Sequence, residues 1–168
     1  YRFKASEKKD RKLSAQLLGS GPILPEVIKA ARVLKDKYGG AADVWSATSY
    51  QELYREGHAV ERGNRLHPDQ TPRVPYVRQC FEGTEGPIVA ASDYVKALPD
   101  AIDRWLPRPL VSLGTDGFGR SENRAALRDF FEVDCRFVVV ATLSALAREG
   151  KIDVAVVQKA IKNLNINT

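Results

Sequence analysis

The 168-residue sequence contains no methionine, only two cysteines and two histidines, and no apolar run close to the roughly 20 residues of a membrane-spanning helix. Without such a run, we expect no membrane segment and no membrane partner. Residues 1–4 are followed by polar residues and not by the apolar core of a signal peptide. Because even an initiator methionine is missing, the sequence predicts a fragment of a longer polypeptide that starts within the chain.

The scarcity of cysteine and histidine disfavours disulfide scaffolds and zinc sites. Cys80 and Cys135 are isolated and form no CxxC pair, whereas a small disulfide-stabilised domain needs more cysteines. The spacing of His58 and His67 from these thiols matches no zinc motif. The sequence therefore predicts reduced thiols, no metal site and a cytoplasmic location.

Positive charge exceeds negative charge, with a net charge of +5 and a pI near 9.3. Residues 1–12 hold six basic and two acidic residues, so this short segment carries most of the excess. Binding to a nucleic-acid backbone needs several cations clustered on a folded surface. We therefore expect residues 1–12 to form a polar linker from a preceding domain, and we expect no nucleic-acid partner.

Residues 13–168 have the length and patterning of one folded domain. Short apolar segments that predict strands alternate with segments of helical periodicity. The predicted strands are 13–18, 42–47, 87–91 and 110–113. The predicted helices are one that ends at Gly39, 49–66 with breaks near Gly57 and Gly63, 93–106 interrupted at Pro99, 122–132, 136–149, and one capped by Asp153. This alternation predicts an α/β fold of three layers, α/β/α, around a mostly parallel sheet.

The most informative segment is Gly114-Thr115-Asp116-Gly117-Phe118-Gly119-Arg120-Ser121, between a predicted strand and a predicted helix. Ligands and partners often meet open α/β sheets at this edge. Asp116 and Arg120 could pair with each other or with a partner, and Phe118 is expected to be exposed. Ser121 is suited to cap the helix that follows. The pattern favours a structural or interface turn, with direct small-molecule contact as the alternative.

Two further segments have a chemical and a structural interpretation. Gly19-Ser20-Gly21 opens a helix and could attract phosphate, but Leu24 replaces the third glycine of a dinucleotide turn, which favours a tight turn. In the segment 57–68, His58 could share a helix face with Glu61 or Arg62 and act as a base. No nucleophile accompanies it, so a charged surface helix is favoured. The residues alone thus indicate no catalytic set.

Several blocks of sequence resemble one enzyme family in that family's order. The blocks are Gln16-Leu17-Leu18-Gly19-Ser20-Gly21, Asp43-Val44-Trp45-Ser46-Ala47-Thr48-Ser49, Glu61-Arg62-x-Asn64-x-Leu66-His67-Pro68, Pro72-Arg73-Val74-Pro75-Tyr76, Leu113 to Ser121, and Phe130-Phe131-Glu132-Val133-Asp134. Over residues 13–150 the chain resembles the C-terminal domain of the homodimeric bacterial pyruvate dehydrogenase E1 components, which are transketolase-like thiamine diphosphate enzymes. This sequence has Gly63 where the family usually carries tryptophan, so the resemblance does not predict how this part of the helix packs.

The resemblance implies a mixed sheet of about five strands, of the transketolase C-terminal type. It also implies that the full-length enzyme uses thiamine diphosphate and magnesium to decarboxylate pyruvate, and acetylates the lipoyl group of the E2 acetyltransferase in the bacterial cytoplasm. In this family the cofactor lies between the two preceding domains. Its motif begins Gly-Asp-Gly and ends in Asn, whereas Thr115-Asp116-Gly117 lacks the first glycine and no Asn lies between Asn123 and Asn163. The resemblance therefore places no catalytic, cofactor-binding or metal-binding residue on this chain.

Three hypotheses follow for function. In the favoured one, the chain is a non-catalytic domain that braces the preceding pyrimidine-binding domain and the E1 homodimer. Asp116, Phe118, Arg120 and Ser121 are its candidate interface residues. The alternative is an interaction or regulatory module that docks another component such as E2, with the lysine-rich residues 1–12 as an electrostatic contact. The third is a nucleotide-binding α/β domain that uses Gly19-Ser20-Gly21.

Overall fold

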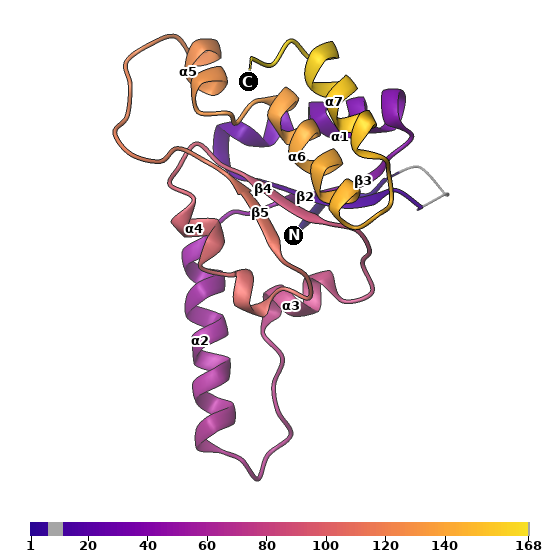
Figure 1. Ribbon diagram of the computed structural model, residues 1–168. Coiled ribbons are helices and arrows are strands. Elements are labelled where there is room, and N and C mark those ends of the chain that lie inside the picture. Colours follow the sequence, from indigo (N-terminus) through magenta and orange to yellow (C-terminus); the bar gives the residue numbers. More distant parts are fainter. Residues whose placement is uncertain (7–11, 168) are drawn as a thin grey trace.

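The computed structural model describes residues 1–6 and 12–167, and within them five strands form one mixed sheet (Figure 1). The spatial order is β1-β3-β2-β4-β5, where β2 to β5 are parallel and β1 is antiparallel to β3. The strands are β1 (Arg2–Lys4), β2 (Ser14–Gly19), β3 (Ala41–Ser46), β4 (Ile88–Ala91) and β5 (Leu110–Leu113). The predicted α/β class and the four predicted parallel strands are confirmed.

Strand β1 occupies part of the segment expected to be a polar linker. The amino group of Tyr1 donates to the Ser46 carbonyl at 3.1 Å, and the Ser6 amide donates to the buried Asp43 carboxylate at 2.7 Å. The edge of β3 thus offers backbone and carboxylate partners that fix this segment, whose apolar and polar residues alternate as in a strand. The rest of the predicted linker includes residues 7–11, which lie outside the described residues.

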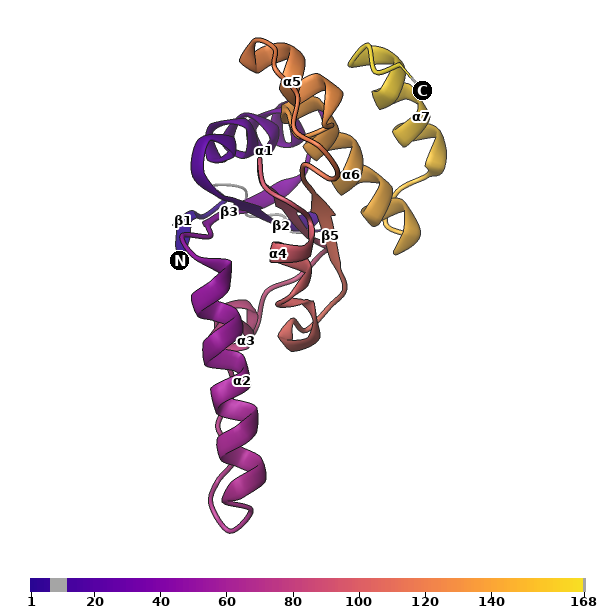
Figure 2. The same cartoon turned by 90° about the vertical axis from the view of Figure 1, so that its left-hand side faces the viewer.

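Helices cover both faces of the sheet (Figures 1 and 2). One face carries α1 (Leu24–Tyr38) and α6 (Cys135–Arg148), and α7 (Val154–Asn163) packs on α6. The other face carries α2 (Tyr50–Leu66), α3 (Tyr76–Phe81) and α4 (Ala97–Asp100), while α5 (Arg124–Phe130) lies between β5 and α6 in the chain. Across the described ranges, no helix combines the length and apolar character needed to cross a bilayer.

The alternation of side chains along the central strands gives the domain two apolar clusters. Leu17 and Val89 face the cluster beneath α1 and α6, and their neighbours Leu18 and Ala90 face the cluster beneath α2 and α3. In the second cluster the rings of Trp45 and Phe81 lie 4.6 Å apart, centroid to centroid. Because both faces of the sheet are covered by the chain itself, the domain contains the core it needs to fold alone.

Two helix predictions were partly wrong: 49–66 in its breaks at glycine, although its bounds are confirmed, and 93–106 in its extent. Helix α2 runs unbroken through Gly57 and Gly63. A Cβ atom on Gly57 would lie 2.7 Å from the Trp105 ring, so this glycine permits close packing. The predicted helix 93–106 is reduced to α4 and a 3-10 turn, Asp103–Trp105, because the Ser92 hydroxyl accepts from the Tyr94 amide and holds this segment in a turn.

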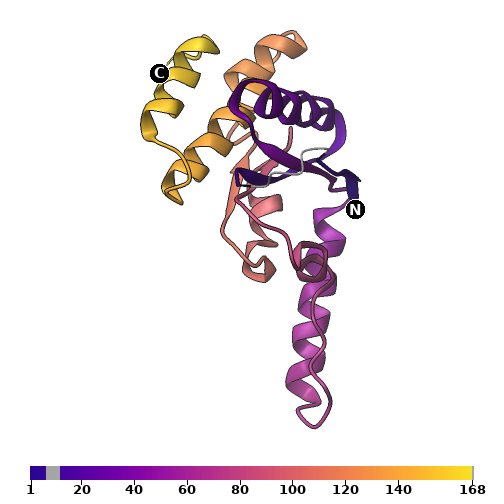
Figure 3. The same cartoon turned by 90° about the vertical axis from the view of Figure 1, so that its right-hand side faces the viewer.

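The end of helix α2 and the segment that follows it form an arm, residues 62–75, that projects from the body of the domain (Figures 1 and 3). The Asn64 side chain makes two hydrogen bonds of 2.9 Å with the backbone of Arg73. These bonds hold the segment that follows the helix against the end of α2. At the base of the arm, the Tyr76 amide donates to Glu56 Oε2 at 2.9 Å, where α3 begins. The arm is therefore a braced hairpin, and α3 is a helix that the sequence did not predict.

Candidate functional site

The carboxyl ends of β2, β4 and β5 meet at one edge of the sheet and bring two of the predicted segments together. From β2 the chain crosses to β3 on one side, whereas β4 pairs on the other side, so the strand order reverses between β2 and β4. Ligands of open α/β sheets bind outside such a point. There the Ser20 hydroxyl donates to the Ser92 hydroxyl at 3.0 Å, which ties the two loops together.

The segment Gly19-Ser20-Gly21 is shaped by packing. A Cβ atom on Gly19 would lie 2.8 Å from Leu24 Cα, so the strand end and the helix touch backbone to backbone. Pro22 and Pro25 remove two backbone N–H groups from the start of the helical segment. A phosphate cradle at a helix N-terminus needs those donors, so the geometry supports the tight-turn interpretation.

The turn that starts at Gly114 is fastened to the loop after β4. A Cβ atom on Gly114 would lie 2.6 Å from the Tyr94 carbonyl oxygen, and the Thr115 amide donates to that oxygen at 2.8 Å. Asp116 Oδ2 lies 2.9 Å from Lys96 Nζ, and its Oδ1 accepts from the Lys96 amide. The hydrogen bond from the Lys96 side chain lowers the pKa of Asp116. The sequence did not identify Lys96, although adjacent parallel strands bring the two loops together.

The other predicted residues of this turn have different surroundings. The Arg120 guanidinium lies 4.7 Å from the centroid of the Phe130 ring, so a pair between Asp116 and Arg120 does not form. Phe118 is 96% exposed. Ser121 does not cap α5, because Asn123 takes that position and its Oδ1 accepts from the Ala126 amide at 3.0 Å.

A cavity of about 590 Å³ lies between this turn, the start of α1 and α5. Three arginines line it: Arg120, Arg124 and Arg128. Its remaining lining consists of Pro22, Ile23, Asp93, Thr115, Gly119, Glu122, Leu127, Phe131 and Val133. The cavity is therefore amphipathic, with an apolar wall, three cationic groups and two carboxylates.

The histidine segment is on α2, away from this edge. His58 Nδ1 lies 3.7 Å from Glu61 Oε2, as the i,i+3 spacing predicted. Glu61 Oε1 also accepts from Trp105 Nε1 at 2.8 Å and lies 3.2 Å from Arg104 Nη2. These contacts pack α2 against the 3-10 turn, and they support the surface-helix interpretation.

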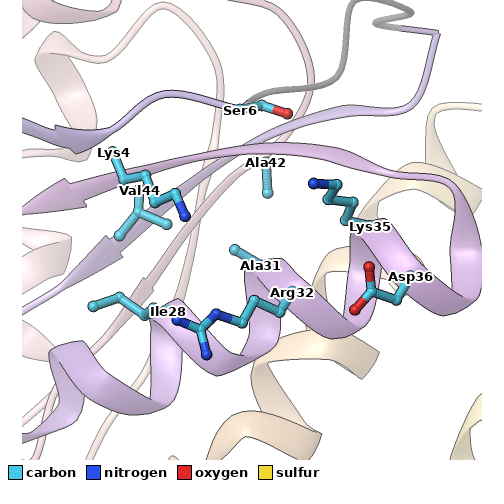
Figure 4. Close-up of a pocket in the computed structure, with 9 residues that line it drawn as sticks. All are labelled: Lys4, Ser6, Ile28, Ala31, Arg32, Lys35, Asp36, Ala42 and Val44. Atoms are coloured by element: carbon cyan, nitrogen blue, oxygen red, sulfur yellow. The ribbon is translucent and has the colours of Figure 1, made fainter.

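A second cavity, of about 270 Å³, lies between α1 and the strands β1 and β3 (Figure 4). Lys4, Arg32 and Lys35 line it together with the acidic Asp36. Lys4 and Lys35 already have interaction partners, and Ser6 in its lining directly precedes residues 7–11. This cavity therefore carries no functional assignment.

The carboxylate of the turn is not open to a metal ion. Both carboxylate oxygens of Asp116 are engaged by Lys96. In the described part of the chain, no group of three or more His, Cys, Asp or Glu side chains is placed to hold a metal ion.

The family model for the transketolase-like TK C-terminal domain matches residues 1–134. The chain belongs to this family. This transketolase-like domain is 50% identical over 162 residues to the pyruvate dehydrogenase E1 component of Pseudomonas aeruginosa, covering 96% of the chain and 18% of that protein. It is also 50% identical over 168 residues to that of Haemophilus influenzae, covering 99% of the chain and 19% of that protein. The domain thus spans about a fifth of these relatives.

Two solved structures share the fold of the transketolase-like domain at 20% sequence identity. A split-gene transketolase, described as an inactive beta4 tetramer, superposes with a TM-score of 0.54 and covers 88% of the chain and 41% of that structure. The transketolase of Leishmania mexicana has a TM-score of 0.56, with coverage of 85% and 17%. These matches confirm the predicted transketolase C-terminal architecture.

Proposed function

We propose that the chain is the non-catalytic C-terminal domain of a pyruvate dehydrogenase E1 enzyme and that it braces the catalytic domains and the homodimer. Similarity to E1 components over nearly the whole chain supports the assignment. The full-length enzyme would use thiamine diphosphate and magnesium to decarboxylate pyruvate and would transfer the acetyl unit to the lipoyl group of E2. The observation that carries the bracing role is the arrangement of the turn 114–121. Its Asp116 carboxylate pairs with Lys96 of the same chain, while its Phe118 side chain faces solvent.

Three aromatic side chains form an aromatic edge around this turn: Tyr94, Phe118 and Phe130, which are 62%, 96% and 57% exposed. Large aromatic residues are enriched at protein interfaces because they bury much surface with few rotatable bonds. Asp116 pairs with Lys96 and Arg120 stacks on Phe130, so the turn is anchored on both sides of Phe118. Such an edge suits docking against another domain or subunit better than it suits catalysis.

The arm offers a second docking element. Leu66 and Val74 are 51% and 44% exposed although they sit on a braced hairpin. Exposed apolar side chains on a rigid projection are typical of surfaces that a partner covers. We infer that the arm reaches toward another part of the E1 assembly, in the bacterial cytoplasm.

Replacing Phe118 with Ser tests the bracing role. Because this side chain has almost no contacts, the unfolding free energy of the isolated domain should change by less than about 0.5 kcal/mol. The dissociation constant of the full-length homodimer, measured by sedimentation at a series of concentrations, should rise at least about tenfold, as for an interface hot spot.

The matched control is Val154→Ser on α7, which removes another exposed apolar side chain far from the aromatic edge in the sequence. It should leave the dimer unchanged. Equal dimer affinities for the two variants and the parent enzyme would contradict docking through Phe118. Retention of E2 by the isolated domain would instead favour the docking-module alternative.

A further inference from the structure

We propose that the cavity at the carboxyl edge of the sheet binds a small phosphorylated metabolite through Arg120, Arg124 and Arg128. Its volume of about 590 Å³ falls within the range of small-molecule sites. It also lies beside the loops after β2 and β4, where the strand order reverses. The proposal shares Arg120 with the bracing role, but it rests on Arg124 and Arg128 of α5, which that role does not use.

Arg128 is held in place before any ligand arrives. Its Nη1 lies 3.0 Å from Glu26 Oε1, and its Nη2 donates to the Pro22 carbonyl at 2.9 Å. Glu26 is buried, and its other carboxylate oxygen accepts from the Cys135 amide. A guanidinium has five N–H groups, so these two bonds leave donors for a ligand. Preorganisation of this kind reduces the entropy that binding must overcome.

Within the part of the chain that the structure describes, the other two arginines have guanidinium groups that are not taken up in ion pairs. Among the described residues, neither Arg120 nor Arg124 forms an ion pair, and Arg120 is instead oriented by stacking on Phe130. Arg124 and Arg128 are one helical turn apart on α5, so both can face the same ligand. Guanidinium groups bind phosphate oxygens through paired N–H donors.

The rest of the lining narrows the class of ligand. Arg128 is paired with Glu26, so the charges of Arg120 and Arg124 face a phosphate monoester, which carries about −1.5 to −2 at neutral pH. Asp93 and Glu122 would repel further negative charge, and they can accept hydrogen bonds from hydroxyl groups. The apolar wall, which includes Ile23 and Phe131, can cover a sugar ring or a base. These features together fit a sugar phosphate or a nucleoside monophosphate.

Recognition at this cavity would rest on side chains and not on a helix N-terminus. Pro22 and Pro25 remove backbone donors at the start of α1, and α5 has only seven residues. A phosphate site in this cavity would therefore need no glycine-rich loop in the sequence. This explains why a phosphate-binding site here would escape detection from Gly19-Ser20-Gly21.

Calorimetric titration of the domain with ribose 5-phosphate and AMP tests the proposal, with ribose as the uncharged control. We expect at least one phosphate ester to bind with a Kd below 1 mM, which is about the edge of specific affinity, and ribose not to bind. Arg124→Gln should weaken binding at least tenfold without changing the melting temperature, since Arg124 is exposed. Arg148→Gln, at an exposed arginine in the last turn of α6, should leave binding unchanged.

Three outcomes would overturn the proposal. One is the absence of binding by both esters. Another is an equal loss in the Arg124 and Arg148 variants, which would indicate nonspecific attraction to a basic protein. The third is that inorganic phosphate or pyruvate binds as tightly as either ester, which would mean that the cavity accepts any small anion.

Discussion

Replacing Gly86 with Ala should destabilise the domain by more than about 4 kcal/mol, enough to leave it largely unfolded. Gly86 has φ +79°, and a Cβ atom there would lie 1.8 Å from the Ser14 carbonyl oxygen. That oxygen belongs to the backbone of the central strand β2 and cannot rotate away. The Arg108 guanidinium also donates hydrogen bonds to the carbonyl oxygens of Gly86 and Thr84. The loop therefore cannot shift without breaking these bonds.

Gly83→Ala is the matched control in the same loop. Gly83 also has a positive φ, +69°, but nothing lies within 4 Å of its added Cβ. Its substitution should cost only the left-handed strain of an L-residue, about 1–2 kcal/mol. Urea unfolding followed by far-UV circular dichroism compares the two variants. Similar stabilities would contradict the close contact between Gly86 and β2.

Glu26→Gln should cost about 2 kcal/mol at neutral pH, because it removes the charge of a buried carboxylate that accepts charge-assisted hydrogen bonds from partly exposed partners. The Glu26 carboxylate connects three parts of the chain: Lys29 on its own helix at 2.8 Å, Arg128 on α5 at 3.0 Å and the Cys135 amide at the start of α6. Glu52→Gln is the matched control, since Glu52 has the same 2.8 Å i,i+3 contact with Arg55 at a 68% exposed side chain. It should cost less than about 0.5 kcal/mol.

The effect of Glu26 should depend on pH in a defined direction. Burial by itself would raise the pKa of Glu26. The hydrogen bonds from the Lys29 side chain and the Cys135 amide, with the charges of Lys29 and Arg128, outweigh burial and lower the pKa below its ordinary value of 4.5. A carboxyl with a lowered folded-state pKa stabilises the fold above its unfolded pKa, and this stabilisation disappears as pH falls through the folded pKa.

The difference in unfolding free energy between the parent and Glu26→Gln should therefore be constant above pH 4.5 and shrink at lower pH. Urea titrations at pH 7 and at successively more acidic values measure it. A difference that stays the same or grows in acid would contradict the ionised role of this carboxylate.

The sequence predicted the parallel strands because buried strands of an α/β sheet are short apolar runs between helices. The prediction failed where contacts between residues distant in the sequence determine the local structure. Gly57 was taken as a helix break, but the Trp105 ring packs against it and the helix continues. Strand β1 was missed although residues 1–6 alternate between apolar and polar side chains, because a highly charged segment follows directly and its partners on β3 lie some forty positions away. The arm depends on hydrogen bonds between Asn64 and Arg73 that no periodicity indicates.

The place of the candidate turn in the fold was predicted, but its contacts were not. The turn 114–121 lies at the carboxyl edge of the sheet, as its place after a strand indicated, and Phe118 is exposed as expected. The partner of Asp116 was missed because Lys96 follows a different strand. The arginine cavity was missed because Arg120 and Arg128 come together only when α5 folds back toward α1, through Glu26.

The most direct test of the non-catalytic role is calorimetric titration of this domain with thiamine diphosphate and magnesium chloride. The residues at the carboxyl edge offer no set of metal ligands among the described positions, and Asp116 is paired with Lys96. We therefore predict no saturable heat at ligand concentrations up to about 1 mM, the weak limit of specific binding. Magnesium-dependent binding in the micromolar range would contradict the account, because the domain would then hold part of the cofactor site itself.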